Sequence, residues 1–197
     1  MGREHGHTLL ETLVVLALSG LLAGLAVPSL SGVRERAQMR GASRELTTQL
    51  REARSRAIAE SRTLALVFER DTRGWRHTLY ADGDGDGIRT VDLTAGIDVP
   101  IASHRRLGDG WPGVDLGFLD LPRIRRLPPS TSWLAAREDP VQFGTTDIVS
   151  FSPQGDASSG TFYISDAKSQ MVAITLFGPT ARVRSYRYDT TQEVWVP

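Results

Sequence analysis

The sequence lacks cysteine and has no excess of charge of either sign. Without cysteine, the 197-residue chain has no disulfide, no thiol nucleophile and no cysteine-bound metal. Its 23 basic and 23 acidic residues give a formal net charge of zero. Binding to nucleic acid or to anionic lipid would therefore depend on a local patch rather than on the field of the whole molecule.

Catalytic signatures are also missing. The sequence has no Gly-x-Ser-x-Gly elbow, no His-Glu-x-x-His pattern and no phosphate-binding loop of the Walker type. Its four histidines form no spaced pair of metal ligands and stand at positions 5, 7, 77 and 104. We therefore predict that the protein is not an enzyme and acts through assembly or binding.

One long apolar run lies near the N-terminus. From Leu9 to Leu30 the only charged side chain is that of Glu11, and a helix of this length can span the hydrocarbon core of a bilayer. A carboxylate in such a segment is costly unless it has a partner. We therefore predict a membrane-spanning helix over residues 7–30, in which Glu11 has a specific role.

An ordinary signal peptide is the alternative interpretation, because Gly24-Leu25-Ala26 resembles a small-x-small cleavage site before Val27. Three features count against it. The apolar run is longer than the usual stretch of roughly 7–15 residues, it contains Glu11, and the leader before it has no net positive charge. A plain signal anchor is a further alternative.

The stretch Gly6-His7-Thr8-Leu9-Leu10-Glu11 resembles the class III signal of type IV pilins and type II secretion pseudopilins. The resemblance implies that residues 1–6 are a leader, that a prepilin peptidase cuts between Gly6 and His7, and that the new terminus at His7 is methylated. It also implies that Glu11, the fifth mature residue, pairs with a neighbouring subunit during assembly. His7 stands where that family usually has phenylalanine. The implied location is the bacterial inner membrane, with the globular domain in the periplasm.

Residues 31–61 keep a helical period but become polar. Apolar residues recur at spacings of mostly three to five, with charged residues between them, and are Val33, Ala37, Ala42, Leu46, Leu50, Ala53, Ala57 and Ile58. We predict an amphipathic stalk that continues the membrane helix and ends near Glu60-Ser61.

Residues 62–197 have the pattern of short strands and turns. The predicted strands are Leu64–Glu69, Trp75–Tyr80, Val141–Phe143, Ile148–Phe151, Thr161–Ser165, Met171–Phe177, Val183–Tyr188 and Val194–Val196. Between Ser103 and Asp139 the pattern weakens, and we expect a long irregular insertion with one or two strands. The predicted fold class is therefore α+β, with a long N-terminal helix packed on an antiparallel β-sheet domain. The resemblance to pilins implies that this layout is pilin-like.

The C-terminal part carries a second resemblance. Phe151-Ser152-Pro153-Gln154-Gly155, Gly160–Ser165 and Ala181-Arg182-Val183-Arg184 are similar in order and spacing to the GspH/FimT family of minor pilins and pseudopilins. Ala181 stands where that family has glycine. The resemblance implies a subunit at the tip or priming complex of a type II secretion pseudopilus or a type IV pilus. The FimT-type members bind DNA for uptake.

An acidic loop is a candidate calcium site. Asp82, Asp84 and Asp86 alternate with glycine as in the first half of an EF-hand loop, and the carbonyl of Ile88 would be a further ligand. Leu93 occupies the place of the bidentate glutamate, for which Asp92 or Asp98 would have to substitute. The alternative is an ordinary acidic turn. A signal-anchored periplasmic calcium-binding domain, outside any filament, is the alternative function.

Arg182, Arg184 and Arg187 form a candidate DNA-binding set near the C-terminus. On a strand, Arg182 and Arg184 face the same side, and Arg187 faces the other unless a bulge intervenes. Paired guanidiniums can bind backbone phosphates, and a nearby tyrosine can stack on an unpaired base. The alternative is a solvated strand face.

Overall fold

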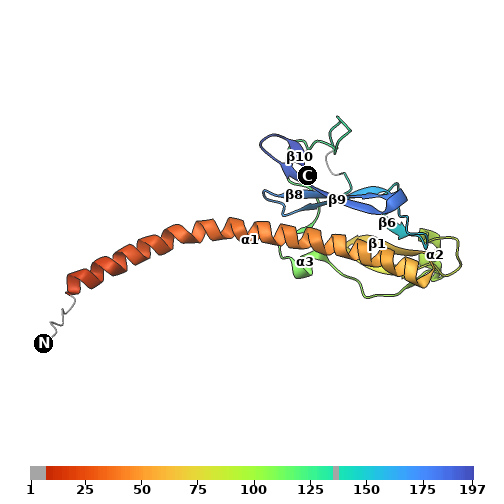
Figure 1. Cartoon of the computed structure of the whole chain (residues 1–197), viewed down its shortest axis with the longest axis horizontal. Coiled ribbons are helices and arrows are strands. Elements are labelled where there is room, and N and C mark those ends of the chain that lie inside the picture. The colour runs from red at the N-terminus through yellow and green to blue at the C-terminus, as the bar shows by residue number, and fades with distance from the viewer. Residues whose placement is uncertain (1–7, 135–137) are drawn as a thin grey trace. The chain divides into compact units, whose positions relative to one another are not determined.

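The computed structural model describes residues 8–134 and 138–197, except for the side chains of residues 22–31 (Figure 1). The chain forms two compact units, Met1–Ala37 and Gln38–Pro197, which we describe separately. Within the described residues, no helix is both long enough and apolar enough to cross a membrane. The predicted span over residues 7–30 lies partly outside the described residues, because residue 7 and the side chains of residues 22–30 are not described.

Helix α1 (Leu9–Glu60) passes through both units. In the second unit its buried apolar residues are spaced three or four apart, as an apolar stripe requires, and are Met39, Ala42, Leu46, Leu50, Ala53 and Ala57. This confirms most of the predicted stripe, but Val33, Ala37 and Ile58 are exposed. The helix ends where predicted, and Ser61 follows it with a left-handed φ of 52°.

The first sheet has four strands in the order β3-β2-β1-β6, all antiparallel. Its strands are β1 (Leu64–Asp71), β2 (Gly74–Ala81), β3 (Val99–Pro100) and β6 (Ile148–Phe151). A tight turn joins β1 to β2, because Asp71 pairs with Gly74 and its carboxylate accepts the amide hydrogen of Arg73 at 2.8 Å. Gly74 has a φ of 109°, which a residue with a side chain rarely adopts.

The second sheet has the order β10-β9-β8-β7-β4, and β5 also pairs with β7. Its strands are β4 (Asp115–Leu116), β5 (Val141–Gln142), β7 (Gly160–Ser165), β8 (Met171–Phe177), β9 (Arg182–Asp189) and β10 (Val194–Val196). Figure 1 shows β8, β9 and β10 next to one another. The α+β class is confirmed, although the strands form two antiparallel sheets rather than one.

The main core lies between α1 and the two sheets and includes Leu46, Leu66, Phe151, Phe162 and Ile174. A second cluster covers the opposite face of the second sheet, where residues of the insertion pack on Tyr163, Tyr188 and Trp195. The Trp195 indole donates to the carbonyl of Arg125 at 2.7 Å. The long insertion is therefore held on the sheet by the C-terminal strand.

Several short elements were not predicted. They are α2 (Thr90–Ala95), β3, α3 (Leu107–Gly110), β4 and the 3-10 helix η1 (Gly178–Thr180). The insertion contains α3 and β4, together with an isolated bridge between Arg125 and Trp133. This agrees with the expectation of an irregular segment with one or two strands.

Candidate functional site

The start of α1 carries the predicted assembly residue. The Thr8 hydroxyl accepts the amide hydrogen of Glu11 at 3.3 Å, and the Thr8 carbonyl accepts the same hydrogen at 3.0 Å. Thr8 therefore caps the helix, and Glu11 lies in its first turn, where the helix dipole favours a negative charge. Gly6 and His7, the predicted cleavage and methylation residues, lie outside the described residues.

The described first turns of α1 expose many aliphatic side chains. They are Leu9, Leu10, Leu13, Val14, Val15, Leu16, Leu18 and Leu21. In soluble proteins, a contiguous exposed apolar surface of this kind marks contact with a membrane or with other proteins. Among the described residues of this unit, nothing covers this part of the helix.

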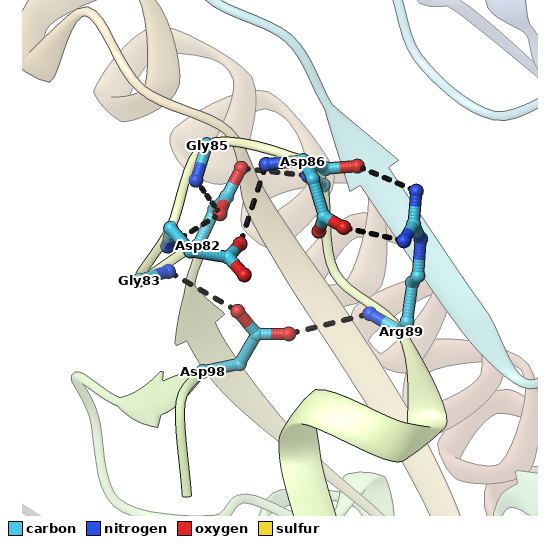
Figure 2. Close-up of polar contacts among 8 residues, drawn as sticks. Asp82, Gly83, Gly85, Asp86, Arg89 and Asp98 are labelled. Carbon is cyan, nitrogen blue, oxygen red and sulfur yellow. Dashed lines mark hydrogen bonds and ion pairs between the residues drawn. The ribbon is translucent and has the colours of Figure 1, made fainter.

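The acidic loop after β2 is tightly curled, as Figure 2 shows. One carboxylate oxygen of Asp82 accepts the amide hydrogens of Asp84 at 3.2 Å and Gly85 at 2.7 Å, and the other accepts that of Gly87 at 2.9 Å. Gly85 and Gly87 have φ values of 90° and 93°, so glycine is required at both positions. The Asp-Gly repeat thus folds as a turn centred on one carboxylate.

The curl brings three carboxylates together. Oxygen atoms of Asp82, Asp84 and Asp86 lie within 4.8 Å of one another, close enough to share one cation. Asp86 also forms an ion pair with Arg89. The pKa of Asp86 is raised above its ordinary value, chiefly by burial and also by the charge of Asp84, while the Arg89 guanidinium opposes this shift.

The other carboxylates considered as calcium ligands, Asp92 and Asp98, are not in this cluster. Asp98 is only 1% exposed, and its carboxylate accepts the amide hydrogens of Gly83 at 3.1 Å and Arg89 at 3.2 Å, so it supports the loop from below (Figure 2). Among the described residues, the cluster does not include Asp92, which lies on α2. The side chain of Ile88 is buried against Ala65. The residues present therefore fit only the first half of a calcium loop.

The arginines of β9 lie as the strand period predicts. Arg182 pairs with Phe177 and Arg184 with Thr175 across β8, so both arginines share one face. Arg187 pairs with Val172 in the same unbroken register and lies on the other face. All three arginines are exposed. The turn before them is made by Ala181, which adopts the left-handed φ of 47° that glycine would reach without strain.

A groove of about 430 Å³ runs beside this arginine pair. It is lined by Arg182, Arg184, Tyr186, the 57%-exposed Phe177 and, from the insertion, Leu127 and Pro128. Within the described part of the chain, no carboxylate forms an ion pair with either arginine. Sequence reasoning missed Phe177 and the insertion residues, because only the register and the folding of the insertion bring them here.

Two family models match the chain. The model described as type II transport protein GspH matches residues 42–178, which is more than half of the chain. The model of the prokaryotic N-terminal methylation motif matches residues 1–27. The two matches cover separate segments, one at the start of the chain and one over the globular unit.

A curated relative agrees with these matches. The type II secretion system protein H of Xanthomonas campestris pv. campestris is 31% identical over 102 residues, which are 52% of this chain and 56% of the relative. The chain thus spans about half the length of that relative. No solved structure matches the chain.

Proposed function

Because the chain belongs to the GspH family of type II transport proteins, we propose that it is a minor pseudopilin of a type II secretion system. The observation that carries the proposal is the presence, on one chain, of the methylation motif at residues 1–27 and the GspH match at residues 42–178. A subunit of this kind acts by assembly, and the chain has no catalytic motif.

The proposed assembly route begins in the bacterial inner membrane. A prepilin peptidase removes residues 1–6, the terminus at His7 is methylated, and the apolar start of α1 crosses the bilayer and later packs among neighbouring subunits. The exposed aliphatic side chains of α1 and the position of Glu11 in its first turn support this route. In a medium of low dielectric constant, the Glu11 carboxylate would attract the amino terminus of the next subunit strongly.

Intact-mass analysis of the chain isolated from membranes tests this proposal. We expect the mature chain to begin at His7, and a start at Val27 would overturn the pseudopilin assignment in favour of a cleaved secretory domain. A Glu11→Ala variant should remain in the membrane and be absent from sheared filaments. If Glu11→Ala assembles like the parent, the assembly role proposed for Glu11 is wrong, even if the mature chain is found to begin at His7.

A second candidate function is DNA binding at the tip of a type IV pilus or of the pseudopilus. It is supported by the shared face of Arg182 and Arg184, which lack an ion pair among the described residues, and by Tyr186 beside them. Two guanidiniums on one face can bind successive phosphates, and Tyr186 offers a ring for an unpaired base. The zero net charge limits this binding to the local patch.

Calcium binding is proposed for the acidic loop. The three carboxylates of Asp82, Asp84 and Asp86 would hold the ion, with the Ile88 carbonyl as a further ligand. The support is the convergence of these side chains in a loop already curled by Asp82. Because the ligand set lacks a bidentate carboxylate, we expect weak affinity and a structural role.

A further inference from the structure

A cleft of about 160 Å³ lies between α1 and β2. Its apolar part is formed by Ala53, Leu66 and Leu79. A water molecule in the liquid takes about 30 Å³, so the cleft has the volume of roughly five waters. This is well below a typical small-molecule pocket of about 300–1,000 Å³, and it suits a single aliphatic side chain.

The helix side of the cleft presents a hydrogen-bond acceptor that has no donor. The side-chain amide of Gln49, a residue only 7% exposed, donates to Glu45 at 3.1 Å, while the other oxygen of Glu45 accepts the Trp111 indole hydrogen at 2.5 Å. Glu45 therefore fixes the orientation of the Gln49 amide. The carbonyl oxygen of Gln49 is buried and has no partner. Further along the helix, the exposed Glu52 and Arg56 also line the cleft, with one charge of each sign.

The sheet side of the cleft presents donors. His77 is 5% exposed, and its main-chain N–H and C=O both bond to Arg105, at 2.9 and 2.8 Å. Its ring packs against Phe68, with 5.2 Å between the centroids. Burial lowers the pKa of His77 to about 4, so near pH 7 the ring is neutral and has one N–H to donate.

The ring N–H of His77 is not used. Among the described residues, no hydrogen bond reaches the His77 ring and no carboxylate forms an ion pair with Arg105. The cleft thus has a buried acceptor without a donor on the helix wall, the ring N–H of His77 on the strand wall, and apolar side chains between them. Buried polar groups are nearly always paired, so the unpaired carbonyl oxygen of Gln49 is unusual.

A peptide group matches this arrangement, because it donates through its N–H on one side and accepts through its C=O on the other. We propose that the cleft is a docking site for an extended segment of a partner protein, which inserts one aliphatic side chain between Leu66 and Leu79 and bonds through its main-chain amide to Gln49 and His77. The proposal extends the assembly role but does not depend on which filament the protein joins.

Proton NMR of the full chain in detergent micelles tests the proposal. The probe is N-acetyl-leucinamide, which carries one aliphatic side chain between two amides, and the reporter is the imidazole signal of His77, assigned by its loss in His77→Phe. We expect this signal to shift in a saturable manner with the probe. Acetamide, which has the amide but no aliphatic side chain, should cause a much smaller shift.

Two variants make the test specific. Gln49→Leu keeps the volume of the side chain but removes the acceptor. It should weaken binding of the probe about fivefold, which is the effect of one hydrogen bond. Gln192→Leu, in the exposed turn before β10, should leave the affinity unchanged. An unshifted His77 signal would mean that the cleft holds only water. Equal shifts with acetamide, or equal affinity in Gln49→Leu, would also overturn the proposal.

Discussion

Gly41 leaves a notch in α1 that the ring of Trp111 occupies: a Cβ atom at position 41 would overlap three atoms of that ring. The indole of Trp111 also donates to Glu45, four residues further along the helix. One turn of α1 thus holds the segment that follows α3, and the absence of a side chain at position 41 is a condition for that contact.

Replacing this glycine should therefore destabilise the protein. In an open helix position, Gly→Ala stabilises by roughly 1 kcal/mol, but overpacking costs about 1–3 kcal/mol, so Gly41→Ala should lower the free energy of unfolding. Urea denaturation followed by tryptophan fluorescence measures the change. Gly32→Ala is the matched control, because a Cβ atom there meets nothing within 4 Å, and it should be neutral or stabilising. Equal effects at the two positions would contradict the close contact between position 41 and the Trp111 ring.

The buried His77 should make the fold sensitive to acid. Its pKa is lowered from 6.5 to about 4 by burial and by the charge of Arg105. A group whose folded pKa is depressed contributes stability that is present above pH 6.5 and is lost as pH falls toward 4, here on the order of 3 kcal/mol. Unfolding measured across this pH range should show the loss, and His77→Phe should remove it.

The contribution of Asp147 to stability depends on pH in the opposite direction over part of this range. Burial, the charge of Asp139 and the hydrogen bond that protonated Asp147 donates to Asp139 raise the pKa of Asp147 to about 6. Its contribution to stability is present below its ordinary pKa of 3.8 and is lost as pH rises through 6. The comparison of His77→Phe with its parent is therefore best made in an Asp147→Asn background. If the acid slope is the same with and without His77, the assignment to this residue is wrong.

Calcium should stabilise the globular unit if the acidic loop binds it. An ion that binds only the folded state adds about 2.7 kcal/mol when its concentration is about 100 times Kd, so the Tm should rise with calcium and fall with EDTA. Asp84→Ala should lose the response, whereas Asp92→Asn, outside the cluster, should keep it. If the Tm does not change with millimolar calcium, the loop is an ordinary turn held by Asp82 alone.

DNA binding through β9 should depend steeply on salt. Each phosphate neutralised on duplex DNA contributes about 0.9 to the slope of log K against log salt, so Arg182→Ala/Arg184→Ala should reduce that slope by about two. Arg187→Ala should change it little, because Arg187 lies on the opposite face. Short duplexes titrated over a salt series provide the measurement, and a double variant that binds like the parent rules out this site.

The pair Arg123 and Arg125 is a poor control for that experiment. Both guanidiniums lie over the ring of Trp133, at 4.3 and 5.1 Å from its centroid, and Arg123 also approaches Glu193 at 3.7 Å. Removing them would disturb the insertion as well as the charge. Arg187 lies on the same strand as Arg182 and Arg184 but on its other face, so it is the cleaner comparison.

The long regular elements could be predicted from the sequence because their signals are local. The helical stripe from Ala42 to Ala57 and the strand at Met171–Phe177 follow from residue spacing alone. The short elements α2 and α3 have too few residues to show a period. Their places depend on contacts distant in sequence, such as Trp111 with Glu45 across 66 residues.

The same division holds for the sites. The sequence places Asp82, Asp84 and Asp86 at alternating positions, and the curl of the loop could be expected from its glycines. The pairing of Asp98 with the backbone of the loop could not, because nothing in its local sequence marks it. Likewise, His77 looks like any strand histidine until α1 covers it.

The bond from the Trp195 indole to the Arg125 carbonyl sets an order on the folding of a newly made chain. The cluster on the outer face of the second sheet draws Leu119, Ile124 and Leu134 onto Trp195, about 60 to 75 residues later in the chain. That cluster cannot close until residue 195 has left the ribosome, and closing so long a loop is slow compared with forming α1. During synthesis the insertion therefore remains open and exposed to proteases and chaperones after the helix and the first hairpin have formed.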